Sequence, residues 1–353
     1  MASQWAIREA IAQASAIARQ QVERLDSATA DKLLAIYQDA AKRLRSAILS
    51  YADDAGNLRL AVLRELLQQV EAAMTALRDA QRVLLRSSLR SSAALGAGIW
   101  TSGESVTLLA DSALRFVETF VAADGLKLSD RLWRMETGVV ERIADTLRRN
   151  IALGQDASKA AQEFLARGEA VPLDLAARAG LQRASTLAST VEAGLIGDDA
   201  PAYANALRVF RTELNRAHGE AYQAGAGSHP DVIGMRFNLS PNHPRVDICD
   251  YYASANLYGL GPGVYPVGEA PWPAHPNTGS YLTAVFRDEV SAQDQAGQHA
   301  PLAWLREQSD TRQEAILGIP KAAALRAGVL NENDITTPWR DLRDGYQQRG
   351  YDF

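Results

Sequence analysis

The sequence predicts a mainly α-helical protein, in which a long helical N-terminal half precedes a smaller, loop-rich α+β domain. Eleven of the 13 prolines lie at or after Pro230, and all five histidines lie at or after His218. The first 200 residues are instead rich in Ala, Leu, Arg, Gln and Glu, which favour helices. We therefore expect an all-helical, partner-binding region over residues 1–200 and an α+β domain over residues 201–353.

Apolar residues in the first half recur every three or four positions, which is the spacing of one helix face. Series that begin at Ile7 and at Leu33 predict two helices, separated by a break at residues 25–27. Further helices are expected over residues 58–90, 105–121, 129–150, 158–166, 173–193 and 202–224.

Residues at the ends of these series suggest where the helices begin and end. Ser129 and Ser158 are suitable N-caps, and Gly168 and Gly194 are suitable stops. Two glycines within residues 94–98 predict an interruption there, because glycine is unfavourable in a helix interior.

The second half follows a different pattern. Residues 234–239 alternate between apolar and polar, and residues 281–286 are β-branched and aromatic, so both segments predict strands. Between them, residues 259–279 contain five glycines and five prolines, a density that we expect to exclude regular structure. The helical pattern returns from Pro301.

Composition excludes several classes of protein. With 47% hydrophobic and 22% charged residues, the chain can bury a core and is not disordered by composition. A formal charge of −5 argues against a general nucleic-acid binder, and a single cysteine rules out an intrachain disulfide. The start lacks a basic segment followed by an apolar one, and the most apolar stretch, residues 93–100, is too short to cross a bilayer. We expect no membrane partner.

Four arginines form a stripe on the third predicted helix. Arg78, Arg82, Arg86 and Arg90 lie four positions apart and therefore share one face. Such a stripe could contact DNA phosphates or an acidic partner. It could equally be a solvated face whose charges pair with acidic residues nearby or on other helices, and we favour this second interpretation.

A second polar group lies on the helix predicted over residues 202–224. Arg211, Asn215 and His218 share one side of this helix, while Glu213 and Arg216 share another. An active-site Arg–Glu pair is one interpretation of these residues. We favour a buried polar network that braces the following loop by hydrogen bonds.

His243, Cys249 and His275 are the candidate soft-metal ligands, with Asp250 or Asp247 as a fourth. Imidazole and thiolate suit Zn²⁺, which could staple a loop that is too polar to form its own core. The spacing of six positions between His243 and Cys249 matches no standard ligand pair. The alternative is that the histidines cap turns and that Cys249 is a small buried apolar residue.

Motifs typical of catalysis are missing from the sequence. It contains no nucleophile elbow, P-loop, Rossmann glycine fingerprint or HExxH motif. Gly96 and Gly98 also lack the flanking strand that a dinucleotide site needs. We therefore predict no catalytic and no cofactor-binding residues, and a protein that is not an enzyme.

Four ordered blocks over about residues 205–335 resemble the Mu F-like domain of tailed-phage minor head proteins, also called head morphogenesis proteins. Residues 211–222 are similar to the helix that opens that domain, residues 237–250 to its central motif, and residues 273–277 to its Pro-rich segment ending in His-Pro-Asn. The last block is similar to the closing helices and comprises Trp304, Leu305, Arg312, Gln313, Ile316, Leu317, Gly318, Arg326, Ala327 and Gly328.

The resemblance implies a structural role at the portal vertex of the phage head. It implies that the portal protein is the main partner, with the major capsid protein, the scaffolding protein and packaged DNA as further contacts. The protein would lie in the virion, and in the host cytoplasm during assembly. The residues that the resemblance marks as structural are Arg211, Glu213, Asn215, Arg216, His243, Asp247, His275 and Asn277.

The sequence departs from the family at one position. Many members continue His-Pro-Asn with Cys-x-Cys, whereas Asn277 is followed by Thr278, Gly279 and Ser280. Two potential metal ligands are therefore missing, and we expect hydrogen bonds to replace a zinc site. Two other functions stay open: a metal-dependent hydrolase or toxin-like enzyme that uses His243, Asp247 and His275, and a DNA-ejection protein that binds DNA through the arginine stripe.

Overall fold

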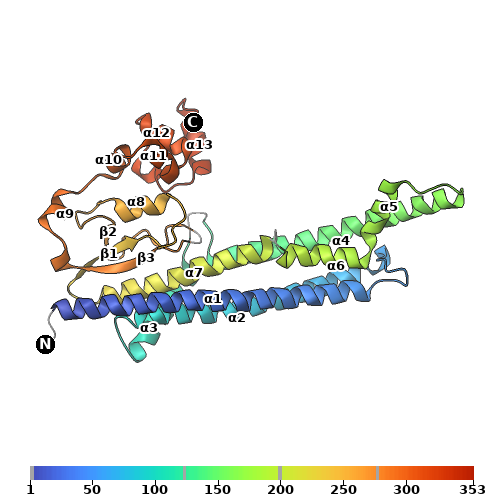
Figure 1. Ribbon diagram of the computed structural model, residues 1–353, viewed down its shortest axis with the longest axis horizontal. Coiled ribbons are helices and arrows are strands. Elements are labelled where there is room, and N and C mark those ends of the chain that lie inside the picture. Colours follow the sequence, from blue (N-terminus) through green and yellow to red (C-terminus); the bar gives the residue numbers. More distant parts are fainter. Residues whose placement is uncertain (1–3, 122–124, 198–200, 276–277) are drawn as a thin grey trace. The chain divides into compact units, whose positions relative to one another are not determined.

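The computed structural model describes residues 4–121, 125–197, 201–275 and 278–353 (Figure 1). The protein is mainly α-helical, with a long helical N-terminal half and a small antiparallel sheet in its C-terminal part, as the sequence predicts. The chain divides into two compact units. Unit 1 comprises Met1–Leu25, Leu89–Gly125 and Arg211–Phe353, and unit 2 comprises Asp26–Ser88 and Leu126–Phe210. This division differs from the predicted boundary at residue 200, because each unit combines segments that lie far apart in the sequence.

Unit 2 consists of helices and the loops between them. It contains parts of α1 (Gln4–Ser50), α2 (Leu63–Ala97) and α7 (Pro201–Ala226), which also contribute residues to unit 1. Its remaining elements are α4 (Leu128–Ala166), α5 (Leu173–Ala179), α6 (Ala184–Ile196) and two short 3₁₀ helices, Leu60–Val62 and Gly180–Gln182.

The core of unit 2 follows the predicted helical periodicity. On α1 the inward residues are Leu33, Tyr37, Ala40, Leu44 and Ile48, and on α2 they are Leu66, Val70, Met74 and Leu77. All of these side chains are at most 5% exposed. Burying a large aliphatic side chain contributes about 1.5–3 kcal/mol, so these faces hold the unit together.

The predicted break at residues 25–27 is wrong, because α1 runs without interruption from Gln4 to Ser50. Asp26 is half-buried and Ser27 is exposed, and each costs a helix only about 0.5 kcal/mol, which the neighbouring turns offset. The division between the two units falls at the same place, between Leu25 and Asp26. The sequence pattern changes there because the buried neighbours of the helix change.

The predicted interruption at residues 94–98 and the two predicted N-caps of serine have different outcomes. Helix α2 passes through Gly96 but ends at Ala97, within the segment where an interruption was predicted. At Gly96 the missing side chain admits the backbone carbonyl oxygen of His218. Helix α4 is continuous, so Ser129 and Ser158 lie inside it and are not N-caps. In its middle, a Cβ on Gly154 would lie 2.6 Å from the backbone nitrogen of Gln182. Here glycine marks close packing.

Of the two glycines predicted to end helices, one does so and the other does not. Gly168, with φ of +73°, follows the end of α4 as expected. The helix expected over residues 173–193 is two helices, α5 and α6, separated by the 3₁₀ turn Gly180–Gln182. Gly194 lies inside α6, which ends instead at Gly197.

Unit 1 contains the sheet and most of the shorter helices. Its helices are α3 (Glu104–Thr119), α8 (Ile248–Ser254), α9 (Ala292–Ala296), α10 (Pro301–Arg306), α11 (Asp310–Leu317), α12 (Ile319–Arg326) and α13 (Trp339–Gln348), with 3₁₀ turns at Arg287–Glu289 and Glu332–Asp334. Its strands are β1 (Val232–Asn238), β2 (Val264–Pro266) and β3 (Tyr281–Phe286).

The strands of unit 1 pair antiparallel in the order β2-β1-β3. Met235 of the central strand lies opposite Tyr265 on one side and Ala284 on the other. Strands β1 and β3 match the predicted segments. Strand β2, however, lies within residues 259–279, where we expected no regular structure. It is only three residues long and forms one edge of the sheet, a position where Pro266 is tolerated.

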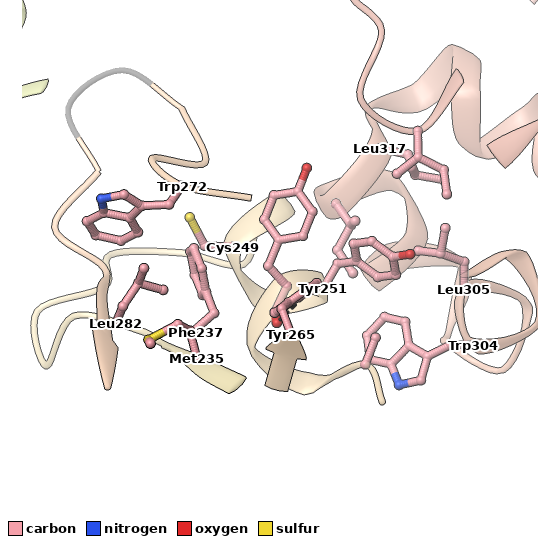
Figure 2. Packing of buried hydrophobic residues seen from close by; sticks show 14 of the residues in the cluster. Met235, Phe237, Cys249, Tyr251, Tyr265, Trp272, Leu282, Trp304, Leu305 and Leu317 are labelled. Carbon is pink, nitrogen blue, oxygen red and sulfur yellow. Dashed lines mark hydrogen bonds between the residues drawn. The ribbon is translucent and has the colours of Figure 1, made fainter. Parts of the chain in front are cut away.

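Helix α8 packs against the sheet, and aromatic residues fill the space between them (Figure 2). Phe237 contacts both Tyr252 and Trp272 edge-on, with ring centroids 5.7 and 6.0 Å apart. Tyr251 continues the cluster to Trp304 on α10, at 5.4 Å. This core is therefore assembled from long-range aromatic contacts rather than from one repeated helix face.

Helices α1 and α7 are tied to β3 within unit 1. The backbone N–H of Ala284 donates to the hydroxyl oxygen of Tyr222 at 2.9 Å, and the same oxygen lies 3.4 Å from the hydroxyl of Ser15. Arg19 stacks on the ring of Tyr281 at 4.4 Å. No helix among the described residues combines the length and apolar character required to cross a bilayer.

Candidate functional site

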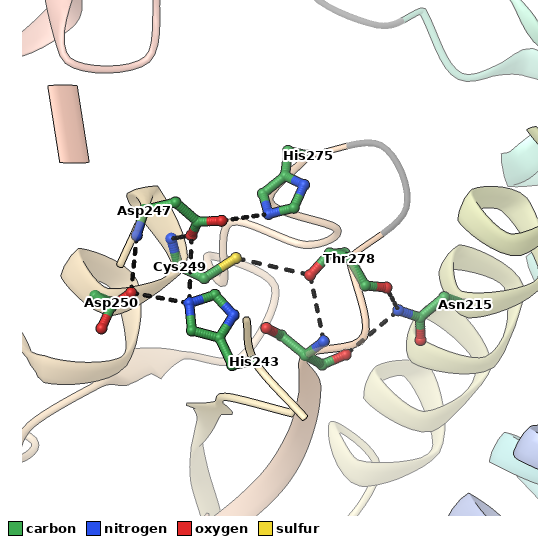
Figure 3. Close-up of polar contacts among 8 residues, drawn as sticks. Asn215, His243, Asp247, Cys249, Asp250, His275 and Thr278 are labelled. Carbon is green, nitrogen blue, oxygen red and sulfur yellow. Dashed lines mark hydrogen bonds and ion pairs between the residues drawn. The ribbon is translucent and has the colours of Figure 1, made fainter. Parts of the chain in front are cut away.

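Three of the four blocks that carry the family resemblance meet in unit 1 (Figure 3). They are the second half of α7, the segment that leads from β1 into α8, and the loop before β3. Side chains from all three lie within one network of polar contacts, although the segments are separated by up to about 60 residues in sequence.

The network is organised by a capping box at the start of α8. Asp247 is the N-cap, and its Oδ1 accepts a hydrogen bond from the backbone N–H of Cys249 at 2.7 Å. In return, the backbone N–H of Asp247 donates to Oδ2 of Asp250 at 2.9 Å. Both carboxylates thus satisfy otherwise unpaired N–H groups at the positive end of the helix.

Two histidines contact these same carboxylates. Nε2 of His243 lies 2.9 Å from Oδ2 of Asp250 and 3.8 Å from Oδ1 of Asp247. Nε2 of His275 lies 3.3 Å from Oδ2 of Asp247. Each contact is an ion pair when the imidazole is protonated and can be a hydrogen bond when it is neutral. Asp247 therefore links the loop before β3 to the start of α8.

Cys249 lies behind the capping box and is fully buried. Its Sγ is 3.6 Å from the hydroxyl of Thr278, which also accepts a hydrogen bond from the backbone N–H of Ser280 at 3.2 Å. Burial raises the pKa of the Cys249 thiol to about 11. At neutral pH this group is a protonated thiol, which is a poor nucleophile.

Asn215 attaches helix α7 to the loop before β3. Its side-chain amide donates to the backbone carbonyls of Thr278 and Ser280, at 2.9 and 3.3 Å. Asn277, the remaining residue of the His-Pro-Asn motif, lies outside the described residues. Thr278, which follows the His-Pro-Asn motif in place of the family's Cys-x-Cys, makes hydrogen bonds at the position where the sequence led us to expect them.

Two other polar residues of α7 contact each other. Glu213 and Arg216 form a buried pair, with Oε2 and Nε 3.1 Å apart and side chains 2% and 5% exposed. The guanidinium of Arg216 also stacks on Phe120 at 3.8 Å. His218 is partly buried, and its desolvation lowers its pKa to about 4, whereas Arg211 is exposed.

The predicted metal ligands fall into two overlapping groups rather than one. Donor atoms of Asp247, Cys249 and His275 lie within 4.8 Å of one another, and so do those of His243, Asp247 and Asp250. Both groups share Asp247, which the sequence offered only as an alternative fourth ligand. The two carboxylates already accept backbone N–H groups, and the Cys249 thiol lies within hydrogen-bond distance of Thr278. A zinc ion would therefore have to displace hydrogen bonds that the donor atoms already make.

Two arginines of the stripe form ion pairs within the two units, and three of the four are exposed. Arg78 Nε lies 2.8 Å from Oε2 of Glu136 in unit 2, and Glu136 is only 6% exposed. Arg90 Nη2 lies 2.7 Å from Oδ1 of Asp111 in unit 1. The side chains of Arg82 and Arg86 are exposed on α2.

The chain was compared with models of protein families, with curated proteins and with solved structures, and none of the three comparisons found a match. The resemblance to minor head proteins rests on the four sequence blocks described above. The structure shows, in addition, which side-chain contacts join three of these blocks.

Proposed function

We propose that the protein is a structural minor head protein of a tailed phage, bound at the portal vertex, where it assists procapsid assembly, DNA packaging or ejection. The observation that carries this proposal is the joining of three family-like blocks by side-chain contacts. Asn215 holds the loop before β3, His275 of that loop contacts Asp247, and Asp247 caps α8. These polar groups are used to hold segments together, which suits a docking module better than a catalytic site.

The helical first half of the chain supplies the proposed partner-binding surface. Long amphipathic helices present faces that other helices or grooves can bind. The two exposed arginines of α2, Arg82 and Arg86, add a cationic patch to this half. Such a patch suits an acidic surface of the portal protein, the major capsid protein or the scaffolding protein, or packaged DNA.

The proposal is tested by co-expression with the portal protein encoded by the same phage, followed by size-exclusion chromatography with light scattering. Co-elution at a defined ratio is the expected result. Separation of the two proteins at both low and high salt would contradict the portal-bound role. The variant Arg82→Glu/Arg86→Glu tests whether the cationic patch takes part, and Arg142→Glu/Arg149→Glu on exposed positions of α4 is its charge-matched control.

A DNA-contacting role of the same patch has a separate signature. Binding to DNA should weaken steeply as salt rises, because each neutralised phosphate releases a counterion. It should also be lost in the Arg82→Glu/Arg86→Glu variant and retained in the control. Affinity that is unchanged by either salt or substitution would remove DNA from the list of partners.

One observation favours a second candidate, a metal-dependent hydrolase. His243, Asp247 and Asp250 present ligand-type atoms within 4.8 Å of one another, and His275 approaches Asp247 from the neighbouring loop. Metal analysis of the purified protein separates the two functions. Zinc, manganese or iron bound at one equivalent, and lost in an Asp247→Asn variant, would favour the hydrolase, whereas a protein purified without metal favours the structural role.

A further inference from the structure

A pocket of about 430 Å³ lies on unit 1, away from the network around Asp247. Helix α7 forms one wall with Glu220 and Gln223, and α3 contributes Phe116. The loop that follows β2 forms the other wall, with Val267, Ala270 and Trp272. The volume is within the range of about 300–1,000 Å³ that is usual for ligand sites, and the lining is apolar apart from a few polar groups.

Two hydrogen-bond acceptors occur together in this pocket. Glu220 and Gln223 are three positions apart on α7 and therefore lie on the same face of the helix. Gln223 is 8% exposed, and its side-chain oxygen receives no hydrogen bond from any residue that the structure describes. A buried acceptor without a donor is unfavourable, so the site is incomplete unless a ligand or water supplies the donor.

Glu220 adds a carboxyl group to the same wall. Burial raises its pKa from the ordinary 4.5 to about 7, although the nearby Arg216 acts in the opposite direction. Among the described residues that line the pocket, Glu220 is the one that can carry a charge near neutral pH. A cation placed against it would favour the ionised carboxylate and remove the unfavourable effect of burial.

Aromatic rings complete the pocket. Phe116 is 39% exposed at its edge. Trp272 lies at the end of the aromatic cluster, with its indole nitrogen on the side away from Cys249 (Figure 2). It packs directly on Gly219, where a Cβ would collide with the indole nitrogen. That nitrogen donates to no acceptor among the described residues. The pocket is therefore lined by a carboxyl group, a side-chain amide and two aromatic side chains.

This combination is complementary to an arginine residue within a polypeptide. A planar guanidinium can donate to a carboxylate and an amide oxygen at the same time and can stack on aromatic rings. A backbone carbonyl beside it would accept from the indole nitrogen. A lysine could satisfy fewer of these groups at once, because its ammonium is a compact charge without a planar face.

We infer that this pocket binds an arginine side chain of a partner polypeptide, with the guanidinium held by Glu220 and Gln223 and flanked by Phe116 and Trp272. The inference goes beyond the proposed structural role and does not rest on it, because the pocket's chemistry is the same whichever protein supplies the arginine. No residue of the network around Asp247 takes part.

The test is calorimetric titration of the full chain at pH 8 with N-acetylarginine N-methylamide. The matched probe is N-acetylcitrulline N-methylamide, which has the same shape without the charge, and the lysine analogue is a third. We expect saturable binding of the arginine probe, with the citrulline probe weaker by about tenfold or more, as loss of a charged hydrogen-bonded pair predicts. The lysine probe should bind between them.

Three variants locate the binding. Glu220→Gln should weaken the arginine probe by about tenfold and bring it level with citrulline. Ala224→Leu, at an exposed position that lines the pocket, should abolish binding by filling the space. Glu104→Gln removes one exposed carboxylate of unit 1 that does not line the pocket, and should change nothing.

The inference is overturned if arginine and citrulline bind equally, if Glu220→Gln binds as the wild type does, or if no saturable binding occurs up to about 10 mM. Circular dichroism of each variant shows whether it has folded. A variant that fails to fold is replaced in the comparison by Gln223→Leu, which removes the second acceptor at nearly the same volume and should also weaken the arginine probe.

Discussion

The two compact units of this chain are held together in different ways. Unit 2 buries apolar side chains that repeat along its helices, such as Leu33, Leu44 and Val70. Unit 1 joins short helices, loops and a small sheet through aromatic contacts and side-chain hydrogen bonds, such as those of Phe237 and Asn215. A helix face with repeated apolar residues tolerates a single substitution, because the neighbouring turns still bury their own side chains. A network of single contacts depends on each residue in it.

Two acids whose pKa is raised by burial, Glu136 and Glu220, differ in their surroundings. In unit 2, Glu136 lies 2.8 Å from Arg78, so its charge has a direct partner. In unit 1, Glu220 lies in the wall of a pocket, and burial raises its pKa to about 7. A carboxyl kept in such a position at a cost in stability is typical of a binding site.

The largest effect is expected where helices of unit 1 approach most closely. Gly96→Ala should destabilise the protein by about 3 kcal/mol or more, because the new Cβ would collide with a backbone carbonyl that has little freedom to move. Gly194→Ala in α6 of unit 2 is the control, since no atom lies within 4 Å of its new Cβ. It should stabilise the helix by about 0.5–1 kcal/mol. Urea unfolding followed by circular dichroism measures both, and equal effects would remove the contrast between the units.

The pocket acid should make the stability of unit 1 depend on pH. Because the folded state raises the pKa of Glu220 from 4.5 to about 7, it binds a proton more tightly than the unfolded state does. Stability contributed by this group therefore falls as pH rises from about 4.5 to 7, by up to about 3 kcal/mol. Relative to wild type, Glu220→Gln should become more stable between pH 5 and pH 8. Parallel stability curves for the two proteins would contradict the assignment.

A smaller effect is expected from the buried ion pair of unit 2. Arg78→Met should cost about 2 kcal/mol at pH 8, since it leaves the Glu136 carboxylate buried without its partner. The loss should shrink at lower pH, because burial raises the pKa of Glu136 and a protonated acid needs no counter-charge. Arg43→Met breaks an exposed pair with Asp39 and should cost less than about 1 kcal/mol. Equal losses in the two variants would mean that burial of the pair has no energetic weight.

The smallest loss of stability is expected from the hydrogen bonds of Asn215, which connect α7 to the loop before β3. Asn215→Ala removes two hydrogen bonds to backbone carbonyls and should cost about 1–2 kcal/mol. Hydrogen exchange should increase at the amide of Ser280, while amides in unit 2 keep their protection. Asn242→Ala, at an exposed turn position, is the control. Unchanged exchange at Ser280 would show that the loop is held without Asn215.

The sequence predicts helices and strands with a repeated apolar pattern better than it predicts individual contacts between distant residues. Strand β3 is predicted to the residue, and the inward face of α1 is correct from Leu33 to Ile48. Gly96 was misread because a glycine that ends a helix and one that admits a neighbouring backbone look the same in sequence. The distinction depends on His218, which lies more than 120 residues away.

The candidate sites divide in the same way. Asn215, His243, Asp247 and His275 could be selected from their residue types and from the family-like motifs. In the structure Asn215 binds Thr278, and the two histidines contact Asp247 and Asp250. Glu220 was not selected, although Gly219 beside it was a usable signal. A glycine inside a helix often marks a close neighbour, and here the neighbour is Trp272, whose position depends on the folding of a distant loop.

Because Cys249 is buried, its reaction with a thiol reagent can be used to measure local opening of the structure. This residue is the one cysteine among the 353 residues, and its side chain is 0% exposed behind the cap of α8. A thiol reagent in solution can label it only when α8 and the loop before β3 separate, and only through the thiolate. The labelling rate of the unmodified protein therefore measures how often that part of unit 1 opens, without an introduced probe and without a signal from unit 2.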